Sequence, residues 1–381
     1  MRGSVWQLGV SWKAGSAYDP SMLAAILREM GDVNLDVCDD VELVEMGPDD
    51  VAIKITHTGV CHSDVSAMNG TIPQAPPAVL GHEGAGIIEE VGSNVDELAP
   101  GDHVIVVWSP SCGNCVYCTG RHQPNLCPNI ALASMARTKF RQAGTELFGM
   151  AGAGTFAEKL IMPRQGVVKI DPDIPLDVAS LIGCGVMTGA GASLNTAKVS
   201  PGSSVVVFGA GGVGVAAIQG ARIAGAAEIV AVDKNPAKLD EAISFGATHA
   251  VLPEDLEDAK NEITGGEGFD FALECVGIPA LMRTAYDMTR RGGTCCIVGV
   301  GRMEEMVSFS AFELFYNEKT LIGSYYGGTD VRTDFHKLLR LWKGGKLDLE
   351  RMITRRITID EINPALEAVR NGEVVRQVIE F

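Results

Sequence analysis

The amino-acid sequence predicts an α/β protein of two parts: a β-barrel-type part followed by a doubly wound parallel sheet. Three observations support this prediction. The length of 381 residues suggests two or three domains at roughly 150 residues each. Short β-branched runs separated by turn residues fill the first part. In the second part, buried strands alternate with helical segments, and the border between the two patterns lies near residue 185.

The composition is that of a globular protein with an acidic surface. Apolar residues make up 46% of the chain and charged residues 21%. The formal net charge of −17 argues against nucleic acid or an anionic membrane as the main partner. No apolar run approaches the ~18 residues that a membrane helix needs, and no secretory signal core is found near the N-terminus. We therefore expect a cytoplasmic protein in which residues 1–21 form an N-terminal extension.

The first part, residues 22–185, is predicted from runs rich in β-branched residues and bounded by Gly, Pro or Asp. Its predicted strands are AIKIT (52–56), GAGIIEEV (84–91) and DHVIVVW (102–108). The segment 92–104 predicts a strand, a turn and another strand.

The second part begins with a β-α-β unit. A strand at 203–209 leads through a Gly-rich turn into a helical pattern at 215–225 and a strand at 228–233. The tail is predicted to be helical at 334–345 and to close with a strand at 375–381. Further buried parallel strands are predicted at 269–277, 292–300 and 320–328.

The Gly-rich turn predicts a dinucleotide site. Gly209, Gly211 and Gly214 form a GxGxxG pattern between a strand and a helix. They provide the tight turn, the close approach of the pyrophosphate and the packing of helix on strand. Asp233 ends the next strand, where its carboxylate can accept hydrogen bonds from the ribose hydroxyls and repel a 2′-phosphate. NAD is therefore predicted rather than NADP.

Ten cysteines in a chain without a secretion signal indicate metal ligands or core thiols rather than disulfides. Four of them fall within sixteen residues: Cys112, Cys115, Cys118 and Cys127. Four thiolates on one short loop can surround a single ion tetrahedrally, which predicts a closed, structural zinc site.

A second, dispersed group is ambiguous when each residue is taken alone. Cys61 lies in VCHSD, His82 in GHEGAG, and Cys184 in LIGCGVMTG at the border between the two patterns. A lone buried Cys or His is more often a structural residue than a ligand. If these three form a metal site, the position of Cys184 places the metal between the two parts, a usual place for a ligand.

Together these motifs resemble the zinc-dependent medium-chain alcohol dehydrogenases. GHEGAGIIEEVGSNV matches the family's GHExxG…G…V signature, and the cysteine-rich loop, the GAGGVG turn and Asp233 follow in the family order over nearly the whole chain. The resemblance implies a GroES-like β-barrel-type catalytic domain over 22–185 and a Rossmann doubly wound NAD-binding domain over 186–325. Residues 326–381 are expected to return to the catalytic domain.

The resemblance also implies roles at a catalytic zinc. Cys61, His82 and Cys184 would hold this second zinc ion, with water or substrate at its fourth position. Asp64 would orient the ligating histidine. Glu83 would be an acid near the metal. Ser63 would take the proton of the alcohol.

Cofactor and substrate residues follow from the same resemblance. His62 and Arg376 match cations at the cofactor pyrophosphate, and Lys238 matches a residue beside the adenosine ribose. Ile72, Trp108 and Val300 match apolar walls of the substrate cleft. The remaining residues expected at the cofactor are Thr188, Gly212, Val213 and Val298, together with Val300.

The expected function is hydride transfer between a small alcohol or aldehyde and NAD by a homodimer, with a homotetramer as an alternative. In many relatives a histidine relays the proton to solvent, but this chain has Ser66 there. A formaldehyde dehydrogenase that uses a glutathione or mycothiol adduct is a second reading, because GCGVMTGAGASLNTAKV (183–199) is close to the glutathione-dependent enzymes. Those enzymes carry an arginine where this chain has Ala131. A third, more distant hypothesis is a non-catalytic NAD-binding module.

Overall fold

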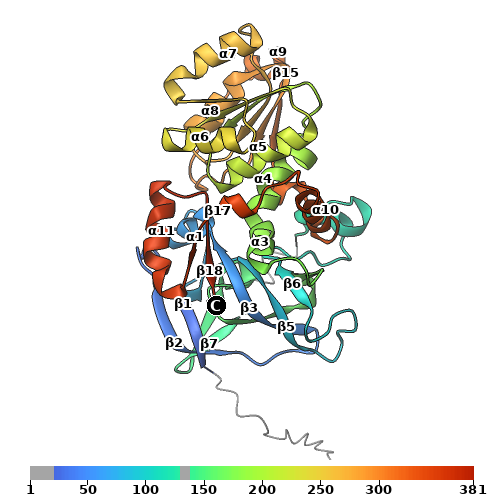
Figure 1. Ribbon diagram of the computed structural model, residues 1–381, viewed down its shortest axis with the longest axis vertical. Helices are drawn as coiled ribbons and strands as arrows, with labels where there is room; N and C mark the ends of the chain where they lie inside the picture. The colour runs from blue at the N-terminus through green and yellow to red at the C-terminus, as the bar shows by residue number, and fades with distance from the viewer. Residues whose placement is uncertain (1–20, 129–137) are drawn as a thin grey trace, which may run out of the picture.

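The computed structural model describes residues 21–128 and 138–381. Two bodies are stacked along the long axis of the molecule (Figure 1). The lower body holds a barrel and a mixed sheet, and the upper body holds one parallel sheet. This arrangement confirms the predicted fold class.

The lower body contains a closed barrel and a sheet of seven strands. The barrel has the order β1-β2-β7-β8-β4, and the sheet has the order β10-β6-β5-β3-β18-β17, with β9 paired to β3. The barrel strands are β1 (Ser21–Leu27), β2 (Asp36–Leu43), β4 (Ala78–Val79), β7 (Phe140–Gln142) and β8 (Thr145–Gly149). The sheet strands are β3 (Asp50–Val60), β5 (Glu83–Val91), β6 (His103–Val106), β9 (Lys159–Pro163), β10 (Val167–Ile170), β17 (Ile353–Ile357) and β18 (Arg376–Glu380).

The predicted strand at the start of 92–104 is wrong. Residues 92–102 form turns and irregular backbone, and a strand begins only at His103. The backbone N–H groups of Gly92 and Asn94 donate to the carbonyls of Asp50 and Pro48, so they are not available for a sheet ladder. Val95 is buried as a single apolar anchor of this loop.

The upper body is a parallel sheet of order β13-β12-β11-β14-β15-β16. Counted from β11, this is the 3-2-1-4-5-6 order of a dinucleotide-binding doubly wound sheet. Its strands are β11 (Ser204–Phe208), β12 (Glu228–Val232), β13 (His249–Val251), β14 (Phe269–Glu274), β15 (Thr289–Ile297) and β16 (Thr320–Gly323). Its helices are α5 (Gly212–Ala224), α6 (Ala237–Ser244), α7 (Leu256–Thr264), α8 (Pro279–Met288) and α9 (Ala311–Tyr316).

Three of these strands end earlier than the sequence predicts. β14, β15 and β16 end at Glu274, Ile297 and Gly323. The remaining predicted strand residues lie in loops and in the 3₁₀ turn η8 (Tyr326–Gly328), at the carboxyl end of the sheet, where ligands bind in open α/β folds.

A continuous helical run joins the two bodies. It comprises α3 (Leu176–Leu181), the π-helical turns η5 (Ile182–Val186) and η6 (Ala192–Thr196), and α4 (Met187–Gly191) between those turns. Contrary to the sequence expectation, this run is long and apolar enough to cross a membrane, with a mean hydropathy of 1.3. In the structure 83% of that window is buried inside the protein, as in a core helix of a globular protein.

The C-terminal segment returns to the lower body. α10 (Val331–Lys343) and α11 (Ile362–Asn371) precede β18, which pairs with β3 in the middle of the lower sheet. A short helix, α1 (His62–Met68), follows β3 directly and contacts α11. The strand that closes the chain therefore lies beside the loop that carries Cys61.

Candidate active site and metal centres

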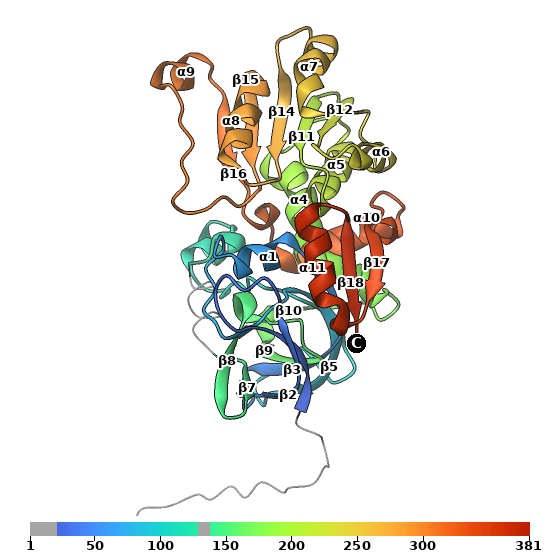
Figure 2. The same ribbon diagram turned by 90° about the vertical axis from the view of Figure 1, so that its left-hand side faces the viewer.

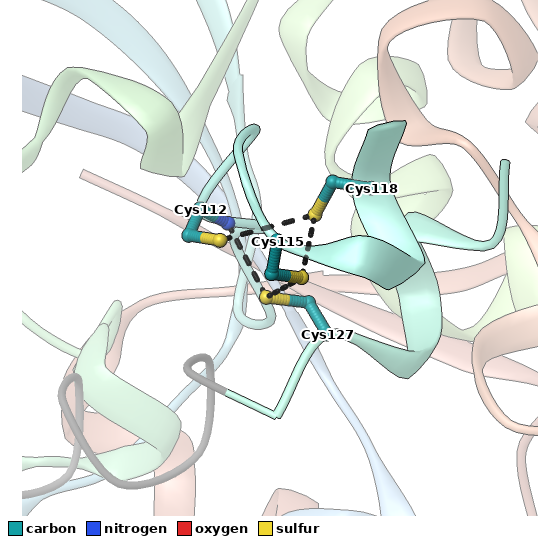
Figure 3. Close-up of side chains that lie close together, drawn as sticks. All are labelled: Cys112, Cys115, Cys118 and Cys127. Atoms are coloured by element: carbon teal, nitrogen blue, oxygen red, sulfur yellow. Dashed lines mark hydrogen bonds between the residues drawn. The ribbon is translucent and has the colours of Figure 1, made fainter. Parts of the chain in front are cut away.

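The four clustered cysteines converge on one point. They come from one loop that includes the π-helical turn η1 (Val116–Gly120), and their sulfurs face one another (Figure 3). The Sγ–Sγ distances are 3.5 Å between Cys115 and Cys118, 3.7 Å between Cys115 and Cys127, and 4.0 Å between Cys112 and Cys118. None of the four is in a disulfide.

These distances match a zinc site. A tetrahedron with Zn–S bonds of about 2.3 Å has edges of about 3.8 Å. All four sulfurs lie within 4.8 Å of one another, so a single ion can contact each of them. No position remains open for a substrate, as in structural zinc sites.

The dispersed group also converges. Cys61, His82, Glu83 and Cys184 each place a ligand atom within 4.8 Å of the others, and all four residues are buried. Cys61 precedes α1, His82 and Glu83 lie at the start of β5, and Cys184 lies in the helical run between the bodies. Within residues 21–128 and 138–381, the Nε2 atom of His82 is buried without a hydrogen-bond partner. Two thiols and an imidazole nitrogen are suitable zinc ligands.

Asp64 holds two of these residues in place. Its Oδ2 atom accepts a hydrogen bond of 2.8 Å from the Cys61 backbone N–H, and its Oδ1 atom lies 3.0 Å from His82 Nδ1. Because a carboxylate accepts, His82 carries its proton on Nδ1 and leaves the Nε2 lone pair for a metal. Burial alone would lower the pKa of His82, but the Asp64 carboxylate and Cys61 raise it well above its ordinary value. A metal ion that binds Nε2 would therefore displace a proton from that nitrogen.

Glu83 and Arg376 lie between the metal group and the dinucleotide turn. The Glu83 Oε1 atom is 3.5 Å from Arg376 Nη2 and accepts a hydrogen bond of 3.0 Å from the Gly185 N–H. Burial raises the pKa of Glu83 to about 7, although the Arg376 guanidinium opposes the shift. In the part of the chain that the structure describes, the buried Nε and Nη2 atoms of Arg376 have no hydrogen-bond partner.

Two glycines leave room for this guanidinium, and a larger residue at either position would displace it. A Cβ atom on Gly212 would lie 2.5 Å from Arg376 Cζ, and one on Gly185 would lie 1.5 Å from Arg376 Nη2. Since Gly212 begins α5, the guanidinium sits at the N-terminus of that helix. A positive side chain and free helix N–H groups together favour an anionic phosphate there.

The predicted Gly-rich turn has the expected geometry. Gly209 adopts φ +91°, and Gly211 is the N-terminal cap of α5. A Cβ atom on Gly214 would lie only 1.6 Å from the Gly209 carbonyl oxygen, so helix and turn pack at backbone distance. Val213 belongs to the first turn of α5.

Asp233 lies beside this turn at the end of β12. Its two carboxylate oxygens accept hydrogen bonds from the backbone N–H groups of Ala210 and Asn235, at 2.8 and 2.9 Å. Lys238 is buried, and its Nζ donates to the Val374 carbonyl at 2.9 Å. Lys238 therefore ties α6 to the segment before β18.

The other predicted site residues are distributed around these two centres. His62 is exposed, whereas Ser66 and Val298 are buried and Val300 is exposed. The Ser63 hydroxyl lies 3.7 Å from Cys61 Sγ. Ala131 lies outside the described residues. Half-buried positions are found for Ile72, Trp108 and Thr188.

Two residues beside the metal group were missed by the sequence analysis. The buried Tyr326 donates a hydrogen bond to the carbonyl of Gly183, the residue before Cys184. Tyr325 precedes it, and its hydroxyl lies 3.3 Å from Ser109 Oγ. Both follow the carboxyl end of β16. The sequence predicts a strand over 320–328, so it placed both tyrosines inside that strand and gave no signal that singled them out.

Comparison with known proteins assigns the chain to a family. Residues 47–172 match the alcohol dehydrogenase GroES-like domain, and residues 212–344 match the zinc-binding dehydrogenase family. An S-(hydroxymethyl)glutathione dehydrogenase from Escherichia coli is 38% identical over 343 residues, which is 87% of this chain and 92% of that protein.

Solved structures agree with this assignment. An alcohol dehydrogenase zinc-binding domain protein from Burkholderia ambifaria is 33% identical, with a TM-score of 0.88, covering 95% of this chain and 99% of that one. Benzyl alcohol dehydrogenase from Acinetobacter calcoaceticus is 31% identical, with a TM-score of 0.87 and the same coverage. The chain belongs to the zinc-dependent medium-chain alcohol dehydrogenase family and is an oxidoreductase.

Proposed function

We propose that this enzyme interconverts primary alcohols and aldehydes with NAD, and that the reaction takes place beside Cys61, His82 and Cys184. One observation carries the proposal. A buried ligand group lies next to Arg376, whose guanidinium covers the N-terminus of α5, and among the described residues the His82 Nε2 atom of that group has no hydrogen-bond partner. A metal site and a pyrophosphate site are thus adjacent, as hydride transfer from an alcohol to a nicotinamide requires.

Two zinc ions are assigned to each chain. Cys112, Cys115, Cys118 and Cys127 would hold the structural ion, and Cys61, His82 and Cys184 the catalytic ion. A zinc ion in the second site would act as a Lewis acid on the alcohol oxygen. Asp64 fixes the tautomer of His82, and Glu83 lies close enough to join the ligand set.

Ser63 is proposed to receive the proton of the alcohol. Its hydroxyl lies within 3.7 Å of the Cys61 sulfur, so it borders the metal group. A hydroxyl can accept one proton while it passes another on. Ser66 cannot titrate near neutrality as a histidine can, so we assign outward proton transfer to water.

NAD is proposed as the cofactor because of Asp233. Its carboxylate is fixed by two backbone N–H groups beside the Gly-rich turn, where a 2′-phosphate would meet a negative charge. Arg376 and His62 are assigned to the pyrophosphate. The remaining cofactor contacts are assigned to Thr188, Gly209, Gly211, Gly212, Val213, Gly214, Lys238, Val298 and Val300, and the substrate walls to Ile72 and Trp108.

The test is reduction of NAD, followed by nicotinamide absorbance, with a panel of primary alcohols. We expect turnover with the wild type and its loss in Cys184→Ala, while the matched core variant Cys296→Ala remains active because Cys296 is buried in the upper sheet. Binding of NAD without turnover of any alcohol or aldehyde would support a non-catalytic module instead.

A thiol-dependent formaldehyde dehydrogenase is the second candidate. It is favoured by the 38% identity to an S-(hydroxymethyl)glutathione dehydrogenase. Formaldehyde should then reduce NAD only when glutathione or mycothiol is added, and simple primary alcohols should be poor substrates. Rates with simple alcohols that do not depend on thiol would exclude it.

We further propose a homodimer formed through the edge of the upper sheet. β16 is the last strand of that sheet, and Figure 2 shows α9 on the same side. Met303, Met306 and Phe315 are 82%, 81% and 81% exposed there, an apolar surface of the kind that marks an interface. Sedimentation should give twice the chain mass.

We also propose a cytoplasmic location, which the ten free cysteines fit.

A further inference from the structure

Three aromatic rings form a wall beside Cys184, and we name Trp108, Tyr325 and Tyr326 the aromatic wall. Trp108 and Tyr325 meet edge to face, with ring centroids 5.6 Å apart and planes at 79°. Trp108 and Tyr326 lie 4.6 Å apart at 46°. These are the separations at which aromatic rings attract one another.

The aromatic wall adjoins the metal group. The Tyr326 hydroxyl donates to the carbonyl of Gly183, so its ring lies one residue from Cys184 along the helical run. Burial raises the pKa of Tyr325. The hydrogen bond with Ser109 lowers this pKa, and the nearby Cys184 sulfur raises it. The Tyr325 phenol is therefore within electrostatic reach of the same sulfur.

The exposed member of the wall is held in one position. Tyr325 is 45% exposed, whereas Tyr326 is 2% exposed. The Tyr325 hydroxyl bonds with Ser109 at 3.3 Å, and its carbonyl accepts a hydrogen bond of 3.2 Å from Asn125 Nδ2. The edge-to-face contact with Trp108 and the bond to Ser109 position the ring itself, so it loses little freedom when a ligand packs against it.

We propose that Tyr325 is a specificity-determining residue that selects an aromatic ring on the alcohol or aldehyde. A substrate whose oxygen faces Cys61, His82 and Cys184 extends its carbon skeleton past the aromatic wall, and a planar ring there continues the edge-to-face array. This inference rests on the proposed function, since it names the substrate class of that same site. A saturated ring gains only burial of apolar area, and a planar ring gains the ring–ring attraction as well.

The experiment compares benzyl alcohol with cyclohexylmethanol, which share one carbon skeleton. Their kcat/KM ratio with NAD is measured in the wild type, in Tyr325→Leu and in Tyr325→Phe. The change in ratio between variants cancels the different intrinsic reactivities of the two alcohols. We expect the benzyl preference to fall about 2- to 12-fold in Tyr325→Leu, which corresponds to ~0.5–1.5 kcal/mol of ring–ring attraction. Tyr325→Phe loses the bond to Ser109 but should keep the wild-type ratio, because it keeps the ring and its edge-to-face contact with Trp108.

A second measurement needs no variant and covers the case in which Tyr325→Leu does not fold. Benzamide and cyclohexanecarboxamide are compared as inhibitors of the wild type competing with the alcohol. Burial of apolar area alone favours the more hydrophobic saturated ring, so tighter inhibition by benzamide supports the proposal. Equal inhibition, or an unchanged ratio in a folded Tyr325→Leu, would overturn it while the proposed function stands. A wild type that oxidises neither alcohol would instead refute the proposed function.

Discussion

Asp64 offers the sharpest test of how the protein prepares its metal ligands. The carboxylate is completely buried and has one oxygen on the Cys61 backbone N–H and the other on His82 Nδ1. In Asp64→Asn the amide has a single acceptor oxygen, so its NH2 group must face one of these two donors. If it faces His82, the imidazole proton moves to Nε2 and blocks the lone pair that a metal needs.

The expected cost is a 10- to 100-fold lower zinc affinity at this site, or about 1.4–2.8 kcal/mol. This agrees with the ~1.5–3 kcal/mol typical of a hydrogen bond to a charged group. Zinc release to a chelating dye measures the loss, and the four-cysteine ion in the same molecule serves as the reference. Only one of the two ions per chain should become easier to remove.

A matched control is Asp270→Asn in the upper sheet. Asp270 accepts a hydrogen bond of 2.8 Å from the Ser204 N–H and lies 2.6 Å from Arg290 Nε. Like Asp64, it is therefore a carboxylate held by a backbone N–H and a nitrogen-containing side chain. This variant should release zinc as the wild type does. If Asp64→Asn also kept both ions with unchanged affinity, the reasoning about His82 would be refuted.

Three further predictions concern the cofactor, the proton path and the cysteine loop. Asp233→Gly should narrow or reverse the preference for NAD over NADP in kcat/KM, and a wild type that uses both equally would contradict the placement of Asp233 at the ribose. Ser63→Ala should lower kcat by roughly 10²–10⁴-fold, whereas Ser66→Ala should change it little; equal damage in both variants would show that Ser66 is an essential link. Cys115→Ser should lose the structural zinc ion and lower the melting temperature, and an unchanged melting temperature would argue against a stabilising role.

The features that the sequence predicts best are local ones. Cys112 to Cys127 and Gly209 to Gly214 are short segments, so residue spacing alone limits what they can form. The upper sheet was predictable because its buried strands are continuous apolar runs in the sequence, and segments with helical periodicity separate them. Its strand ends were predicted too far along, since apolar residues such as Val298 remain buried after the ladder stops.

Long-range contacts account for most of what sequence reasoning missed. Tyr326 reaches Gly183 across 143 positions, and no period or spacing links the two. The loop at 92–102 buries Val95 as an apolar anchor. A pattern of alternating apolar and polar residues cannot distinguish this valine from a buried strand residue. Cys61, His82 and Cys184 could be joined only through family resemblance, because each alone fits an ordinary core position.

Zinc content tests the central claim most directly, since the account depends on a second metal site at Cys61, His82 and Cys184. Elemental analysis of carefully prepared protein should give two zinc ions per chain in the wild type and one in Cys184→Ala, with alcohol oxidation lost in that variant. A wild type with a single zinc ion, or a Cys184→Ala enzyme that keeps two ions and full turnover, would contradict the account.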